Sequence, residues 1–158
     1  MLVEPNPDFH YALLSKHRNA WILPHCLSTK TTPTTVDFFA NLHVGGIIHE
    51  ETASLPHNRT SDQLLSRNIR VQCFPLYSVL KAIGNPKVDY FSLDIEGPEY
   101  QVLKTIPWND VNIKVLGIET EHAGLVYEGS EEDIISYLRS VGYQTKKKVG
   151  HDLFFIKK

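Results

Sequence analysis

Acidic side chains stand at the ends of three apolar runs in this sequence of 158 residues. They are Glu4 after the first run, Asp94 with Glu96 after the second, and Glu119 with Glu121 after the third. Carboxylates can accept hydrogen bonds from hydroxyl groups, offset a bound positive charge or act as a base. One acid after a strand is ordinary turn chemistry, whereas three such endings predict a shared ligand-binding edge lined with carboxylates.

Local structure offers another interpretation of each acid. Asp94 and Glu96 could cap the amides of the helix that follows them, and Glu4 could be an acid at the start of its own helix. Glu99 falls in the first turn of the helix after Asp94, where its charge suits the helix dipole. Glu119 could contact a substrate or pair with a nearby base.

Histidine is the other residue type here that could take part in proton transfer. The eight histidines are scattered and lack the i, i+4 spacing of a metal-binding helix, so no metal site is predicted. His122 stands just past Glu119 and Glu121, close enough to reach the same edge. It is therefore the candidate acid, base or substrate contact, with an ordinary surface histidine as the alternative.

The elements that position these residues follow from hydrophobic periodicity. Strand and helix patterns alternate along much of the chain, which predicts an α/β fold with a mostly parallel sheet. Residues 88–95 suit a strand covered on both faces, and we expect this strand and residues 115–118 to be neighbouring, parallel and central. Because ligands bind beyond the carboxyl ends of such strands, Asp94 and Glu119 should reach the same edge.

Helices and further strands flank these two. We expect Asn6 to cap a helix that starts with Pro7, and Ser130 to cap another with acids in its first turn. The last two runs should close the sheet as an antiparallel pair. Helices are expected at 7–19, 61–67, 77–84, 98–106 and 130–143, and other strands at 1–5, 20–28, 36–42, 43–50, 69–76, 143–149 and 151–158.

Composition and charge bound the class of protein. With 42% hydrophobic and 22% charged residues the chain resembles ordinary globular proteins, and its length suits one domain over residues 1–158. A net charge of −2 gives no electrostatic footprint for nucleic acid. No apolar run approaches the roughly 20 residues that span a bilayer, so we expect the chain as given to be soluble, without a membrane segment.

Two cysteines and one sequon bear on the cellular compartment. Cys26 and Cys73 lack metal-ligand spacing, and buried free thiols are the favoured interpretation, with a single disulfide as the alternative. Asn58 opens the triplet Asn-Arg-Thr, a glycosylation sequon that hints at a secretory compartment, although such triplets also arise by chance.

Four stretches of the sequence resemble FkbM-type methyltransferases. The stretch SLDIEGPEYQVL, residues 92–103, resembles the family signature, an apolar strand followed by Asp-x-Glu-Gly-x-Glu and a helix. VEPNP at 3–7 resembles the second strand and its acidic turn, and IETEH at 118–122 the strand after the signature helix. VDFFANLHVGGI at 36–47 resembles an inserted hairpin. The resemblance covers most of the chain.

The resemblance implies a Rossmann-like fold that binds S-adenosylmethionine and transfers its methyl group to a hydroxyl of a small or glycosyl acceptor. Glu4 would then accept hydrogen bonds from both ribose hydroxyls. Asp94 and Glu96 would offset the positive sulfonium and orient the acceptor, so that Asp94 serves both cofactor binding and catalysis. Glu119 would contact the substrate, and His122 is the third catalytic candidate.

The sequence departs from the family pattern at its start. The family begins with a strand and a Gly-rich turn that holds the methionine part of the cofactor, whereas here nothing precedes residues 1–5. We therefore expect an N-terminally truncated domain that lacks this first, central strand, with unpaired backbone groups beside the gap. Such a chain should by itself be inactive, bind the cofactor no tighter than about millimolar, and oligomerise or aggregate.

A second function follows from one branch of the same family. The wording DYFSLDIEG with VLKTIPW, residues 89–97 and 102–108, resembles the branch that includes Star, a membrane protein of the secretory pathway. The resemblance implies a non-catalytic protein that assists vesicle-mediated transport of growth-factor precursors from the endoplasmic reticulum to the Golgi. In that case the partner would be a membrane-bound growth-factor precursor, and the Asn58 sequon would fit the location.

Overall fold

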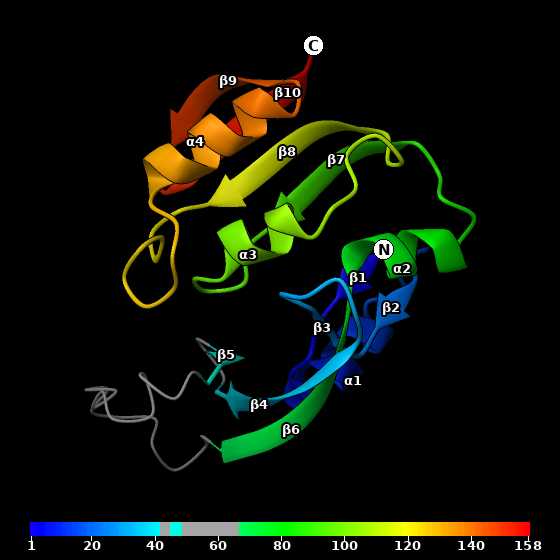
Figure 1. The fold of residues 1–158 in the computed structure, drawn as a ribbon. Coiled ribbons are helices and arrows are strands. Elements are labelled where there is room, and N and C mark those ends of the chain that lie inside the picture. Colours follow the sequence, from blue (N-terminus) through cyan, green and yellow to red (C-terminus); the bar gives the residue numbers. More distant parts are fainter. Residues whose placement is uncertain (42–44, 49–66) are drawn as a thin grey trace. The chain divides into compact units, whose positions relative to one another are not determined.

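The computed structural model describes residues 1–41, 45–48 and 67–158 (Figure 1). The chain forms two compact units. Unit 1 spans Met1–Ser28 and Thr32–Phe74, and unit 2 comprises Thr29–Thr31 and Pro75–Lys158. The expectation of one domain over residues 1–158 stays a prediction.

The described residues of unit 1 form one helix and two small sheets (Figure 1). The first sheet pairs β1 with β2 in parallel, and the second has the strand order β3-β6-β4-β5. In it β3 runs parallel to β6, whereas β4 is antiparallel to both β5 and β6. The elements are β1 (Leu2–Val3), α1 (Pro7–Ser15), β2 (Ile22–Leu23), β3 (Cys26–Leu27), β4 (Thr34–Ala40), β5 (Gly46–Ile47) and β6 (Arg67–Phe74).

The start of α1 is fixed by the predicted cap. The side-chain oxygen of Asn6 accepts a hydrogen bond from the Asp8 amide at 3.1 Å, and Pro7 is the first helical residue. Asn6 is only 1% exposed, and its amide nitrogen donates to the carbonyl of Asn41 at 3.0 Å. The cap therefore also ties the helix to the end of β4.

Cys26 and Cys73 form a disulfide, so the favoured interpretation of two free thiols was wrong. They stand directly opposite each other in the parallel pair of β3 and β6, with their Cα atoms 4.3 Å apart. A sequence separation of 47 residues gave no sign of this pairing, which only the register of the two strands creates. Around the disulfide pack Phe38, Ala40 and Val71, which together with it form a buried core.

Unit 2 is built on a four-stranded mixed sheet with the order β7-β8-β10-β9 (Figure 1). Its elements are α2 (Leu76–Ala82), β7 (Val88–Leu93), α3 (Glu99–Lys104), β8 (Ile113–Glu119), α4 (Glu131–Ser140), β9 (Tyr143–Val149) and β10 (Asp152–Lys157). The expected parallel pairing of β7 with β8 is confirmed, and so is the closing antiparallel pair of β9 and β10. In this sheet β8 is an inner strand, whereas β7 is an edge strand, as β9 is. Only Leu93 of β7 is buried, so the expected central strand covered on both faces at residues 88–95 was wrong.

Mixed sheets replace the mostly parallel sheet that the alternating pattern predicted. Among the described residues, three strand pairs are parallel and four are antiparallel. The antiparallel pairs arise because β4 pairs with both β5 and β6, and because β10 folds back between β8 and β9. A Rossmann-like parallel arrangement is therefore not confirmed. The sequon at Asn58 and most of the helix expected at 61–67 lie outside the described residues, and Arg67 begins β6.

The core of unit 2 fixes the position of its sheet edge. Ser130 caps α4 as predicted, in a reciprocal box with Asp133 whose hydrogen bonds are 3.2 Å and 2.9 Å long. The phenol of Tyr143 donates to the carbonyl of Ile113 at 2.7 Å, which satisfies a buried hydroxyl. The side chains at 1% exposure or less that pack here include Val102, Leu103, Ile113, Leu116, Ile118, Ile134, Leu138, Tyr143 and Phe155.

Within the described part of the chain, none of the helices has the length and apolar character required to cross a membrane.

Reduction of the Cys26–Cys73 disulfide should lower the free energy of unfolding of unit 1 by roughly 2–4 kcal/mol, because a cross-link over a long loop restricts the unfolded chain. Urea unfolding followed by circular dichroism, with and without a phosphine reductant, measures this difference. A Cys26→Ala/Cys73→Ala variant is the control and should not respond to the reductant. Coincident curves for the oxidised and reduced wild-type protein would contradict the prediction.

Candidate functional site

The carboxyl ends of β7 and β8 bring acidic side chains together. Leu93 is paired with Ile118 at the end of the parallel ladder, so Asp94 and Glu119 follow side by side. Carboxylate oxygens of Asp94, Glu99 and Glu119 all lie within 4.8 Å of one another. The predicted meeting of Asp94 and Glu119 at one edge of the sheet is confirmed.

Glu99 lies in the first turn of α3, as predicted, but it is buried beneath this edge. It has no exposed surface, although it is the first residue of α3. One oxygen accepts from the Ile95 amide at 2.8 Å, and the two oxygens share the Gly97 amide at 3.2 Å and 3.0 Å. Burial raises the pKa of Glu99, and these amide hydrogen bonds oppose that rise.

The turn between β7 and α3 has an uncommon backbone. Glu96 has a φ of 64° and Gly97 a φ of 129°, both in the region that side chains disfavour. A Cβ at Gly97 would lie 3.1 Å from the ring of Tyr127, so glycine permits both the conformation and the close ring contact. Sequence analysis missed Tyr127, since only the turn places it here.

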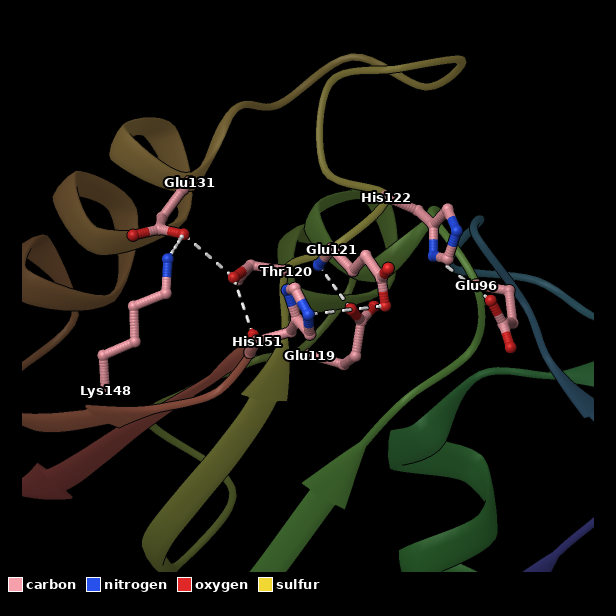
Figure 2. A network of polar contacts seen from close by, with 8 residues as sticks. All are labelled: Glu96, Glu119, Thr120, Glu121, His122, Glu131, Lys148 and His151. Atoms are coloured by element: carbon pink, nitrogen blue, oxygen red, sulfur yellow. Dashed lines mark hydrogen bonds and ion pairs between the residues drawn. The ribbon is translucent and has the colours of Figure 1, made fainter.

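Glu96 meets His122 across the site (Figure 2). The Oε2 atom of Glu96 lies 3.1 Å from Nδ1 of His122, and the two side chains are 28% and 34% exposed. Nδ1 is buried and makes no hydrogen bond to a described residue, so the contact is one of charge rather than a hydrogen bond, and it leaves Nε2 for proton transfer. The structure thus brings together two of the three predicted catalytic residues, with Asp94 two positions before Glu96.

Glu119 has one satisfied and one open oxygen. Oε1 accepts a hydrogen bond from the Glu121 amide, which holds the side chain at the end of β8 (Figure 2). Oε2 is buried and accepts no hydrogen bond from any described residue. The carboxylate of Glu121 in turn lies 4.0 Å from Nε2 of His151. Glu119 therefore keeps one acceptor for a ligand.

The site carries a negative charge that the protein only partly offsets. Burial, and then the charge of Asp152, raises the pKa of Asp94, while His122 lowers it. Burial is also the largest cause that raises the pKa of Glu119, with Asp94 and Glu121 adding to it, while the Glu121 amide and His122 lower it. Like charges held close together disfavour ionisation. This set of carboxylate oxygens, with its excess of negative charge, fits a cationic ligand.

The segment from Thr120 to Ser130 is fastened at both ends, and it carries His122. The Thr120 hydroxyl lies 2.9 Å from Oε2 of Glu131 and 2.8 Å from the carbonyl of His151 (Figure 2). Lys148 donates to the same Glu131 oxygen at 2.6 Å, and this bond lowers the pKa of Glu131. Sequence analysis gave no signal for this network, because its members come from the residue after β8, from α4 and from the β9–β10 hairpin.

Glu4 lies in unit 1 and is tied to the start of α1. Its Oε1 accepts from the Asn6 amide at 2.7 Å, and its carbonyl lies 2.7 Å from Nε2 of His10. Burial raises the pKa of Glu4, while the Asn6 amide and His10 lower it. This is the helix-start role that the sequence offered as the alternative, and the role of Glu4 toward a ribose stays a prediction.

Among the residues that the structure describes, two groups of side chains have the composition of a metal site. One is Asp94, Glu99 and Glu119, and the other is Glu119, Glu121 and His122. Both oxygens of Glu99 already accept backbone amides, which removes it as an open ligand. Acidic clusters of this kind also occur without an ion, so we assign no metal to either group.

The comparisons with known proteins identify the family. Residues 1–145 match the family model described as the Methyltransferase FkbM domain. Because the match covers most of the chain, the protein belongs to the FkbM methyltransferase family, as its signature stretch indicated. The family implies a methyltransferase-like α/β fold and a small-molecule acceptor. No curated protein and no solved structure was found to match the chain.

Replacement of Asp94 by Asn should raise the melting temperature by about 1–3 °C at neutral pH. The pKa of Asp94 is raised in the folded state, so stability is lost as pH rises from the unfolded to the folded pKa. Below both pKa values the carboxyl is neutral in either state, and the gain should disappear. Calorimetric melts between about pH 3 and pH 8 measure this trend.

Asp89→Asn, at an exposed position on β7, is the matched control. Its melting temperature should differ little from that of the wild type at every pH. An Asp94→Asn protein that melts below the wild type at neutral pH would mean that contacts of Asp94 stabilise its charge.

Proposed function

We propose that this FkbM domain belongs to an S-adenosylmethionine-dependent O-methyltransferase that acts on a hydroxyl group of a small or glycosyl acceptor. The family membership supports the class of reaction. The observation that carries the proposal is the pair of Glu96 and His122, 3.1 Å apart, beside the acids at the ends of β7 and β8. A base can take the proton of the hydroxyl, and a negatively charged edge suits a positively charged sulfonium.

His122 is the proposed general base for the acceptor hydroxyl. Nδ1 of His122 lies beside the Glu96 carboxylate, so the lone pair of Nε2 is the proposed acceptor of the hydroxyl proton. The imidazolium that then forms gains stability from the Glu96 carboxylate. Glu96 thus favours the protonated product.

The acids at the ends of β7 and β8 are proposed to hold the cofactor and the acceptor. S-adenosylmethionine, when bound, would supply the methyl group on a positively charged sulfur. Asp94 would offset that charge, and the open oxygen of Glu119 would accept a hydroxyl of the acceptor. Glu4 is proposed to accept the ribose hydroxyls. Most of the rate gain would come from proximity and orientation, since the methyl donor and the oxygen must be in line.

The test uses the full-length protein and measures two quantities. Asp94→Ala and Glu4→Ala should each weaken S-adenosylmethionine binding by about tenfold or more in calorimetry, because each removes a charged hydrogen-bond acceptor. His122→Asn should leave that affinity unchanged and lower the rate of S-adenosylhomocysteine formation by about 10²–10⁴-fold.

His151→Asn is the matched control, since His151 is a more exposed histidine whose ring lies 4.0 Å from Glu121. It should retain both affinity and rate. A full-length protein that does not bind S-adenosylmethionine would sink the proposal, and equal rates for the His122→Asn and His151→Asn proteins would remove His122 from it.

The disulfide favours a second proposal, about location. A buried disulfide in unit 1 suits a chain that folds in an oxidising compartment such as the endoplasmic reticulum, where the Asn58 sequon could be glycosylated. Such a location is what the non-catalytic, Star-like trafficking function requires. Endoglycosidase sensitivity and thiol labelling of the protein from cells test it. Fully reduced cysteines in the cellular protein would exclude it.

A further inference from the structure

We propose that Glu99 is a positioning residue whose buried carboxylate holds the turn from Asp94 to Gly97, so that Glu96 meets His122. The catalytic role of the contact between Glu96 and His122 rests on the proposed function. The hydrogen bonds of Glu99 and the distance between Glu96 and His122 are independent of that function.

The hydrogen bonds of Glu99 bracket Glu96. They come from the amides of Ile95 and Gly97, the residues directly before and after Glu96. Since a single rigid carboxylate binds both amides, it fixes the backbone on both sides of the residue between them.

The backbone at Glu96 needs such a restraint. Its φ of 64° is uncommon for a residue with a side chain, and Gly97 follows with a φ of 129°. Conformations of this kind persist where the surroundings over-determine them, and they concentrate at functional sites. The two amide hydrogen bonds supply that restraint. They also stabilise the carboxylate of Glu99, because burial of an unpaired charge is unfavourable.

The restrained turn meets the segment from Thr120 to Ser130 at two points. Glu96 contacts His122 at 3.1 Å, and Gly97 lies beneath the ring of Tyr127. Burial, and then the charge of Glu99, raises the pKa of Tyr127 to about 12, so its hydroxyl stays protonated near the site. A relaxed turn would disturb both contacts.

If Glu99 only interacted with the helix dipole, its side chain would be expected at the surface. An acid that serves only the dipole stays at the surface of the first turn, as Glu132 does in α4. Glu99 instead turns back from α3 to the two preceding amides and is fully buried. The pair of Glu99 and Glu132 therefore offers a matched comparison between the two roles.

A double-mutant cycle tests the proposal through stability. Glu96→Gln and His122→Asn are combined in the wild-type and in a Glu99→Gln background, and the unfolding equilibrium constants are measured in urea. In the wild type, the two effects should depart from additivity by about two- to fivefold, the usual size for a partly exposed ion pair. With Glu99→Gln, an NH2 group replaces the oxygen that accepts from the Gly97 amide at 3.0 Å, two donors then face each other, and the two effects should become additive.

Glu132→Gln is the control background and should keep the full non-additivity. A Glu99 with only a structural role would change the overall stability in the Gln background but leave the non-additivity intact, and that result would overturn the proposal. If Glu99→Gln prevents folding, Glu99→Asp keeps the charge and withdraws it by one methylene, with the same two outcomes.

Activity separates this inference from the proposed function. In the full-length protein, Glu99→Gln should lower kcat for methyl transfer and leave the affinity for S-adenosylmethionine within about twofold. Loss of non-additivity in a protein without methyl transfer would support the positioning role and reject the enzyme. Unchanged kcat in an active enzyme would overturn the positioning role alone.

Discussion

The parallel pairing of β7 with β8 is the constraint on which the candidate site depends. Leu93 and Ile118 are paired at the end of the ladder and are both buried, so the hydrophobic core and the backbone hydrogen bonds fix one register. Because the two strands run in the same direction, Asp94 and Glu119 emerge at the same edge. An antiparallel pair would send them to opposite ends, and a slip of one residue would turn a side chain to the other face.

The acids gathered at this edge work against stability, and other contacts offset the cost. Burial raises the pKa values of Asp94, Glu99 and Glu119, and neighbouring carboxylates add to the rise. Backbone amides at Glu99 and Glu119, together with His122, oppose it. The packed core of unit 2 supplies the stability that permits this arrangement. Carboxyl groups with raised pKa values of this kind cluster at functional sites.

Local signals in the sequence predicted a good part of the fold. The caps at Asn6 and Ser130 are residue-level chemistry that needs no partner from afar, and both are confirmed. The closing hairpin of β9 and β10 depends on one turn between two adjacent runs. The mostly parallel sheet was not confirmed, since period-two patterns predict strands but do not say which strands become neighbours or in which direction they pair.

The sequence by itself determined the family, through one signature stretch, and the acidic residues of the site, through their places at the ends of apolar runs. Tertiary structure alone decided what these residues do. It joined Cys26 to Cys73, turned Glu99 inward to two amides and set Glu96 against His122. The physical reason is that burial and strand register arise from contacts between segments far apart in the chain. The residue type alone does not say whether water or a backbone amide will surround a carboxylate.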